Sequence, residues 1–167
     1  MTLENLWPSG WEELTRPYTV QRGMVEIVLN SMNAPIDEGV AANAISGFCL
    51  IVDDSALVRK IARKIFTRRG FEIDEAENGQ IALDKCQSRM PDVVLLDWNM
   101  PVMDGLELLR KIRGNARFSA VPVVMVTTEA EMDQMTLALE AGATEYIMKP
   151  FTKEILADKL RMAGLVE

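Results

Sequence analysis

The 167-residue sequence contains no histidine and only two cysteines, Cys49 and Cys86. Without histidine, a Ser-His-Asp hydrolase and any histidine-ligated zinc site are excluded. Any metal must therefore be held by oxygen atoms. The two cysteines fall in a predicted strand and a predicted helix, where we expect buried, reduced thiols, as in a cytoplasmic protein. A disulfide or redox pair is the alternative.

The sequence also lacks long apolar runs and an excess of positive charge. No run reaches the roughly 18 apolar residues that span a bilayer, and the N-terminus shows no secretion signal, so we expect no membrane insertion. The formal net charge of −7 argues against DNA binding. One predicted helix is an exception, because it carries six basic residues: Arg59, Lys60, Arg63, Lys64, Arg68 and Arg69. A solvated face is the default interpretation, and a docking surface for an acidic partner or ligand is the alternative.

From Phe48 onward, short apolar segments alternate with segments of helical period. The predicted strands are Phe48–Val52, Phe71–Glu75, Val93–Leu96, Val121–Val126 and Tyr146–Met148. The predicted helices are Ser55–Arg69, Gly79–Arg89, Gly105–Arg113, Ala130–Ala141 and Thr152–Ala163. This pattern predicts an α/β fold of the flavodoxin-like, doubly wound class, with a five-stranded parallel sheet in the order 2-1-3-4-5 and helices on both faces.

Residues 1–47 have a different character. Proline and glycine interrupt this segment repeatedly, no helical or strand period is sustained, and two tryptophans, Trp7 and Trp11, lie near its start. We expect an extension that is flexible or partly docked, followed by one domain at residues 48–167. Translation from Met24 or Met32 is an alternative that would remove much of this extension.

Polar residues follow four of the five predicted strands. Asp53 and Asp54 follow the first strand, Asp97 the third, Thr127 and Thr128 the fourth, and Lys149 the fifth. The carboxyl ends of parallel strands meet at one edge of the sheet, which is where doubly wound folds bind their ligands. We therefore expect these side chains to converge.

Three carboxylates at one edge repel one another unless a cation lies among them. Oxygen ligands of this kind favour Mg²⁺. A carboxylate can attack phosphorus, and Lys149 and Thr127 offer a positive charge and a hydroxyl for a phosphoryl group. Each residue also has a simpler explanation, such as a helix cap, a turn or a strand end. The simpler explanations would require four independent coincidences at one edge of the sheet, so we favour a common site.

Four segments resemble the receiver domains of two-component response regulators, and among these the CheY-like chemotaxis regulators: Leu50–Ser55, Leu96–Leu109, Met125–Ala130 and Tyr146–Thr152. The resemblance covers about residues 48–167. It implies that Asp97 is the phosphoacceptor and that Mg²⁺ is bound by Asp54, Asp97 and the backbone carbonyl of Asn99, with Asp53 acting mainly through water.

The resemblance also implies a switch. Thr127 would bond the phosphoryl group, Lys149 would pair with a phosphoryl oxygen, and the ring of Tyr146 would turn inward. Asn99 and Glu129 would tune the loss of the phosphoryl group, and the bond between Lys149 and Pro150 is expected to be cis. The switched partner surface would include six residues: Ala130, Met132, Met135, Ala143, Met148 and Lys159.

The expected function is that of a single-domain response regulator, because the sequence ends directly after the last helix. Its partners would be a sensor histidine kinase or histidine phosphotransfer protein and a downstream target, with the flagellar motor switch as one candidate. Glu131 and Met132 stand where CheY-like proteins often carry a lysine, which weakens the motor assignment. The alternatives are a phosphorelay intermediate, a phosphate sink or a cyclic di-GMP effector.

The enzyme alternative is an aspartyl-nucleophile phosphatase of the haloacid-dehalogenase type. Such phosphatases need a second aspartate two residues after the nucleophile as general acid and base. Asn99 occupies that position here, which argues against hydrolysis of external phosphate esters. We therefore expect a phosphoacceptor whose only chemistry is self-phosphotransfer and autodephosphorylation.

Overall fold

The computed structural model describes residues 47–128 and 132–165. In the second range, side chains are described from Asp133 onward. Five parallel strands form one sheet in the order β2-β1-β3-β4-β5, as predicted. They are β1 (Gly47–Val52), β2 (Phe71–Ala76), β3 (Val93–Asp97), β4 (Val123–Thr127) and β5 (Glu145–Met148). The helices are α3 (Ala56–Thr67), α4 (Gly79–Ser88), α5 (Gly105–Gly114), α6 (Met132–Glu140) and α7 (Lys153–Met162). The extension predicted at residues 1–47 lies outside the described residues except for Gly47, and its division from the domain stays a prediction.

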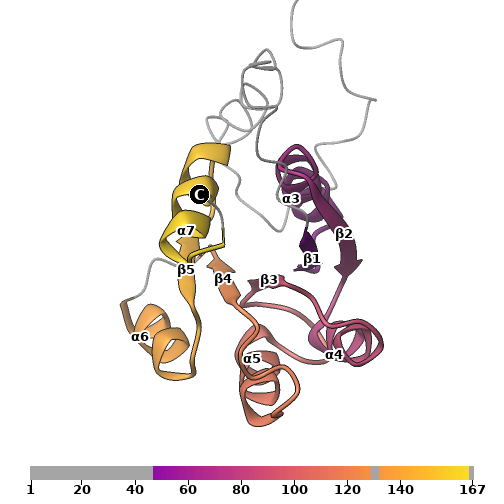
Figure 1. The fold of residues 1–167 in the computed structure, drawn as a ribbon. Helices are drawn as coiled ribbons and strands as arrows, with labels where there is room; N and C mark the ends of the chain where they lie inside the picture. The colour runs from indigo at the N-terminus through magenta and orange to yellow at the C-terminus, as the bar shows by residue number, and fades with distance from the viewer. Residues whose placement is uncertain (1–46, 129–131, 166–167) are drawn as a thin grey trace, which may run out of the picture. The chain divides into compact units, whose positions relative to one another are not determined.

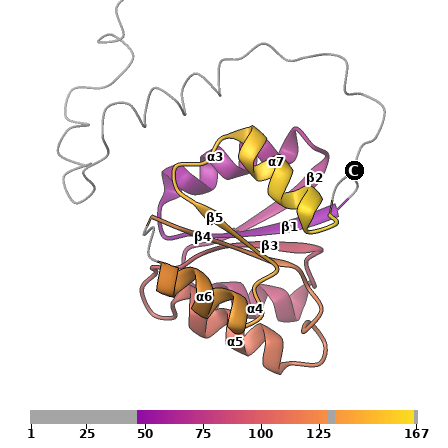
Figure 2. The ribbon, with the colours of Figure 1, turned by 90° about the vertical axis from the view of Figure 1, so that its left-hand side faces the viewer.

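The sheet is the middle of three layers. Helices α3 and α7 cover one face, and α4, α5 and α6 cover the other (Figures 1 and 2). The first interface is built around Phe66 of α3 and Leu160 of α7, and the second around Leu109 of α5 and Ala138 of α6. Every residue of β3 and β4 is buried, which is the burial expected of strands covered on both faces.

Capping side chains fix where the helices begin. Four of the five have a side chain at the N-cap that accepts from the main-chain N–H three residues on: Ser55, Asn78, Asp104 and Thr152. Such caps satisfy amide groups that a helix leaves unpaired. Two of these residues, Ser55 and Thr152, were predicted as the first helical residues and lie one position outside. The helices α3, α4 and α7 also end one or two residues before the predicted positions.

The fourth strand starts two residues later than predicted. Val121 N–H donates to the carbonyl of Phe118 in a turn, and Pro122 has no N–H to donate to a neighbouring strand. The strand therefore begins at Val123 and extends to Thr127, so Thr127 belongs to the strand end itself. The sixth helix begins at Met132, and Ala130, its predicted start, lies outside the described residues. In the part of the chain that the structure describes, no helix is both long and apolar enough to cross a membrane.

Candidate functional site

Four strands deliver the predicted polar side chains to one edge of the sheet. Asp97 and Thr127 are the last residues of β3 and β4, Asp53 follows β1 directly, and Lys149 follows β5. The parallel register places these strand ends side by side, since Asp97 of β3 pairs with Val126 of β4, and Thr127 pairs with Met148 of β5. The strand ends therefore lie side by side as predicted, whereas Thr128 is exposed.

Asp53, Asp54 and Asp97 form a compact acidic group. One carboxylate oxygen from each residue lies within 4.8 Å of the other two. Asp53 and Asp97 are buried, whereas Asp54 is exposed, so the group opens to solvent on one side. Three oxygen donors with one open side suit a hard divalent cation that keeps part of its hydration shell.

Lys149 joins two of these carboxylates. Its ammonium nitrogen lies 2.5 Å from Oδ2 of Asp53 and 2.9 Å from Oδ1 of Asp97. The sequence predicted a lysine ready for a phosphoryl oxygen, but it did not predict the ion pair with Asp53. The peptide bond between Lys149 and Pro150 is cis, as expected.

Burial raises the pKa of Asp97 from 3.8 to about 6. The positive charge of Lys149 lowers this pKa, whereas the negative charge of Asp53 raises it further. The pKa of Asp53 is also raised, first by burial and only partly offset by Lys149. For Lys149, burial lowers the pKa, but the two carboxylates outweigh it and the net shift is upward. One ammonium therefore compensates incompletely for the acidic group, which leaves room for a second cation.

Thr127 and Tyr146 are the two residues predicted to move in the switch. Thr127 is fully buried, and its hydroxyl donates to Oε1 of Gln134 on α6 at 3.4 Å. Gln134 was not predicted, and no local motif in the sequence marks it. Tyr146 is buried in the core beneath α4, α5 and α6. Its inward turn on phosphorylation stays a prediction, and in this structure the ring is already buried.

The loop after Asp97 is held between two glycines. Gly105 N–H donates to the carbonyl of Trp98 at 2.9 Å, and Gly79 N–H donates to the carbonyl of Met103 at 3.0 Å. A Cβ atom on Gly105 would lie 2.1 Å from the carbonyl oxygen of Asp97, and one on Gly79 would lie 2.7 Å from that of Met103. The sequence marked both glycines only as helix starts. Their contacts with this loop require the tertiary structure.

The residues predicted to tune dephosphorylation are only partly described. Asn99 is exposed and follows Asp97 by two residues. Glu129 lies outside the described residues. Both assignments stay predictions.

The predicted partner surface is mixed in character. Met148 is exposed, and Lys159 pairs with Glu145 at 2.8 Å between α7 and β5. Met135 and Ala143 are only partly exposed, because they pack against the core. Ala130 and the side chain of Met132 lie outside the described residues. Four exposed apolar residues on α6 and α7 were not predicted for this surface: Leu137, Leu139, Ile155 and Met162.

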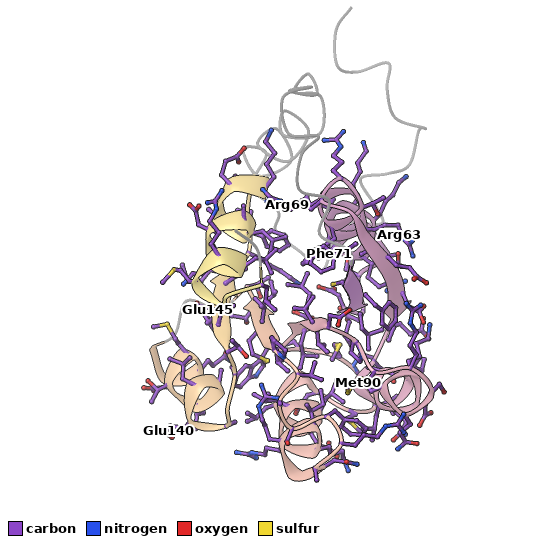
Figure 3. All side chains as sticks on the ribbon, in the orientation of Figure 1. Arg63, Arg69, Phe71, Met90, Glu140 and Glu145 are labelled. Carbon is purple, nitrogen blue, oxygen red and sulfur yellow. The ribbon has the colours of Figure 1, made fainter. Side chains whose placement is uncertain are left out.

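The basic helix α3 has two kinds of basic residue. Arg59 and Arg63 both pair with Glu75 of β2, at 3.0 and 2.5 Å. Lys60 and Lys64 are exposed, as is Arg68 directly after the helix, which agrees with a solvated face. Arg69 is half-buried. Figure 3 shows Arg63 toward the outer side of α3 and Phe71 on the inner side. The two cysteines, Cys49 and Cys86, are free and buried, as predicted.

Fold and site together define a class of protein: a doubly wound domain with an acidic, lysine-bridged group at the carboxyl ends of its strands. The family model described as "Response regulator receiver domain" matches residues 49–161. The chain belongs to the response regulator receiver domain family.

Individual relatives agree with this assignment. The chain is 43% identical over 115 residues to the chemotaxis protein CheY1 of Helicobacter pylori, covering 68% of this chain and 93% of the relative. It is 42% identical over 113 residues to a CheY homolog of Campylobacter jejuni, covering 66% and 87%. The structure of the chemotaxis response regulator CheY4 of Vibrio cholerae superposes with a TM-score of 0.67 at 33% identity, over 71% of this chain and 98% of that one.

Proposed function

We propose that this protein is a phosphorylation-switched response regulator in which Asp97 accepts a phosphoryl group from a histidine kinase or a histidine phosphotransfer protein. The observation that carries the proposal is the convergence of Asp97 with Asp53, Asp54 and Lys149 at one edge of the sheet. A carboxylate of this kind can form an acyl phosphate, and fixed cations stabilise the charge that develops on the transferred group. The function is signalling rather than turnover of an external substrate.

Asp53, Asp54, Asp97 and the backbone carbonyl of Asn99 would hold Mg²⁺, and the donor set fits this ion because it consists of oxygen atoms alone. When bound, Mg²⁺ supplies positive charge that neutralises the carboxylates and the transferring phosphoryl oxygens. Its binding would also offset the cost of ionising Asp97, whose pKa is raised to about 6 by burial.

In the transfer step, a carboxylate oxygen of Asp97 bonds to phosphorus as the bond between phosphorus and the donor's histidine nitrogen breaks. The imidazole leaves with the electron pair and takes a proton from solvent. Lys149 is 2.9 Å from Asp97 and is placed to move its ammonium to a phosphoryl oxygen. Autodephosphorylation is attack by water on the same phosphorus, and Asn99 and Glu129 would tune its rate.

The new phosphoryl oxygens give the Thr127 hydroxyl a stronger acceptor than Gln134, 3.4 Å away. Movement of this hydroxyl would let the ring of Tyr146 repack and would change the surface formed by α6, β5 and α7. A partner that prefers the changed surface then shifts the population. Among the described members of this surface, Met148 is exposed, and Met135, Ala143 and Lys159 are partly exposed.

The relatives named above are chemotaxis proteins, and they support chemotaxis or motility as the pathway, with a protein of the flagellar motor switch as one candidate target. Two free, buried cysteines suit a reducing compartment, and we place the protein in the cytoplasm. We assign it neither DNA binding nor membrane insertion.

The test is labelling with ³²P-acetyl phosphate or with a phosphorylated kinase in the presence of Mg²⁺. The wild-type protein should be labelled, and Asp97→Asn and EDTA should abolish the label. Asp104→Asn is the matched control, because Asp104 caps α5 in the same loop but lies outside the acidic group. Equal labelling of wild type and Asp97→Asn would overturn the proposal. Pull-downs with the phosphorylated and unphosphorylated protein would then identify the switched partner.

A further inference from the structure

Arg59 contacts the main chain of the acidic turn rather than its carboxylates. Its Nη1 donates to the carbonyl oxygen of Asp53 at 2.7 Å and to that of Asp54 at 3.3 Å. Its Nε donates to Oε2 of Glu75 at 3.0 Å. The Arg59 side chain is only 16% exposed, so solvent does not replace these contacts easily. One guanidinium therefore links helix α3, strand β2 and the turn that carries two of the three carboxylates.

Glu75 holds the guanidinium of Arg59 in place. Its second oxygen, Oε1, accepts from Nε of Arg63 at 2.5 Å, so the carboxylate is fixed from two sides. A guanidinium presents several donors in one rigid plane, and this geometry allows Arg59 to bond Glu75 and the two carbonyls together. A lysine has a single ammonium and cannot reproduce that arrangement.

Lys149 holds the Asp53 carboxylate, but the main chain of the turn has few hydrogen bonds besides those from Arg59. Asp53 N–H donates to the carbonyl of Ala76 at 3.1 Å, and Ser55 N–H donates to Oδ1 of Asp53 at 2.8 Å. The carbonyl oxygens of Asp53 and Asp54 both accept hydrogen bonds from Arg59. The orientation of a carbonyl fixes its peptide plane and hence the direction of the side chains on either side. Outer contacts of this kind commonly set the affinity of a metal site.

We propose that Arg59, held by Glu75, is a positioning residue for the cation site, and that it acts by fixing the Asp53–Asp54 main chain so that both carboxylates face Asp97. The inference rests on the proposed function, since it assumes that the acidic group binds Mg²⁺.

Simple electrostatics predicts the opposite sign for the loss of this residue. Removing a positive charge beside three carboxylates strengthens the attraction of the site for Mg²⁺. Removing a positioning contact weakens binding, because the carboxylates must then be ordered when the cation arrives. The sign of the change in Mg²⁺ affinity therefore separates positioning from a charge effect.

The experiment measures the dissociation constant for Mg²⁺ in Arg59→Met, Arg59→Lys and Arg63→Met. Trp98 is next to Asp97, and its fluorescence would report binding in a background with Trp7→Phe and Trp11→Phe, checked by calorimetry. We expect Arg59→Met to weaken Mg²⁺ binding about tenfold. Arg59→Lys should weaken it too, although it keeps the charge. Arg63→Met is the matched control, since Arg63 pairs with the same Glu75 but not with the turn, and it should stay within about twofold.

A second measurement needs no metal. Amide hydrogen exchange of Ser55 in EDTA should be about tenfold faster in Arg59→Met than in wild type, because the turn opens more often. If Arg59→Met does not fold, Mg²⁺ affinity and amide exchange of Ser55 are both measured in Arg59→Lys instead. Unchanged or tighter Mg²⁺ binding in the Arg59 variants, or equal weakening in Arg63→Met, would overturn the positioning role. Failure of the wild-type protein itself to bind Mg²⁺ would instead overturn the proposed function.

Discussion

The ammonium nitrogen of Lys149 lies 2.9 Å from Oδ1 of Asp97 and, at the same time, 2.5 Å from Oδ2 of Asp53. All three side chains are largely buried, so the contact is shielded from solvent. Before any phosphoryl group arrives, Lys149 thus compensates for two carboxylates that would otherwise repel each other. This resting role is distinct from the role proposed for it in phosphotransfer, and the two can be measured separately.

Lys149→Met should destabilise the Mg²⁺-free protein by about 3 kcal/mol at pH 8, because two buried carboxylates lose their partner. The cost should fall by at least half at pH 4, because burial raises the pKa of Asp97 to about 6 and raises that of Asp53 as well, and protonation removes charges that need compensation. Urea denaturation in EDTA at both pH values measures this. Lys111→Met is the control, since Lys111 forms only an exposed pair with Glu107 at 3.5 Å and should cost under about 0.5 kcal/mol. An equal cost for Lys149→Met at both pH values would contradict the electrostatic explanation.

Asp97→Asn should stabilise the Mg²⁺-free protein, and the gain should grow with pH. Burial raises the pKa of Asp97 from 3.8 to about 6 in the folded protein, so ionisation is harder there than in the unfolded chain. The stability that protonated Asp97 contributes is full below pH 3.8 and is lost as the pH rises through 6. Asparagine resembles the protonated acid and escapes this loss.

The gain from Asp97→Asn should be about 2 kcal/mol larger at pH 7 than at pH 4, as measured by urea denaturation in EDTA. Asp133→Asn, on the exposed surface of α6, should change stability by under about 0.5 kcal/mol at either pH. A gain from Asp97→Asn that is the same at both pH values would exclude ionisation of Asp97 as its cause.

Gly105→Ala should destabilise the protein by more than about 2 kcal/mol, since the new Cβ would lie 2.1 Å from the carbonyl oxygen of Asp97 and the main chain has to move. It should also slow phosphorylation by acetyl phosphate, because the displaced atoms belong to Asp97. Gly114→Ala lies in the same helix and meets no atom within 4 Å, so it should cost little. Similar effects of the two substitutions in thermal denaturation would show that the contact with Asp97 is not the cause.

Val102→Gly should stabilise the protein by roughly 0.5–1 kcal/mol. Val102 has a φ of 69°, and Met103 N–H donates to the carbonyl of Pro101 at 2.8 Å across it, so this β-branched residue occupies a tight turn in the left-handed region. It is 81% exposed and therefore loses little packing on replacement. Chemical denaturation of Val102→Gly against Val102→Ala, which keeps most of the strain, separates relief of strain from loss of the side chain. A destabilised Val102→Gly would contradict the prediction.

The regular elements were predictable because their signals are local. The apolar runs of β3 and β4 and the capping residues Ser55 and Thr152 act within a few positions of the elements they define. The same locality explains the errors at the ends. Strand β4 begins after Pro122 because proline has no N–H to donate to a neighbouring strand. This effect depends on which strands pair, and a short segment of sequence does not show the pairing.

The sequence by itself determined the doubly wound fold class and the edge of the sheet at which five residues meet: Asp53, Asp54, Asp97, Thr127 and Lys149. The reason is that parallel strands of a doubly wound sheet end on the same side whatever their length. It also determined that any metal at that edge is bound by oxygen atoms. Only the tertiary structure decided how these residues are held. The ion pair of Lys149 with Asp53 joins residues 96 positions apart in the chain. The hydrogen bonds of Arg59 to the acidic turn and the fit of Gly105 against Asp97 join nearer residues, and they depend on the path of the turn between them. Such distances follow from the packing of the helices on the sheet, which no spacing of residues records.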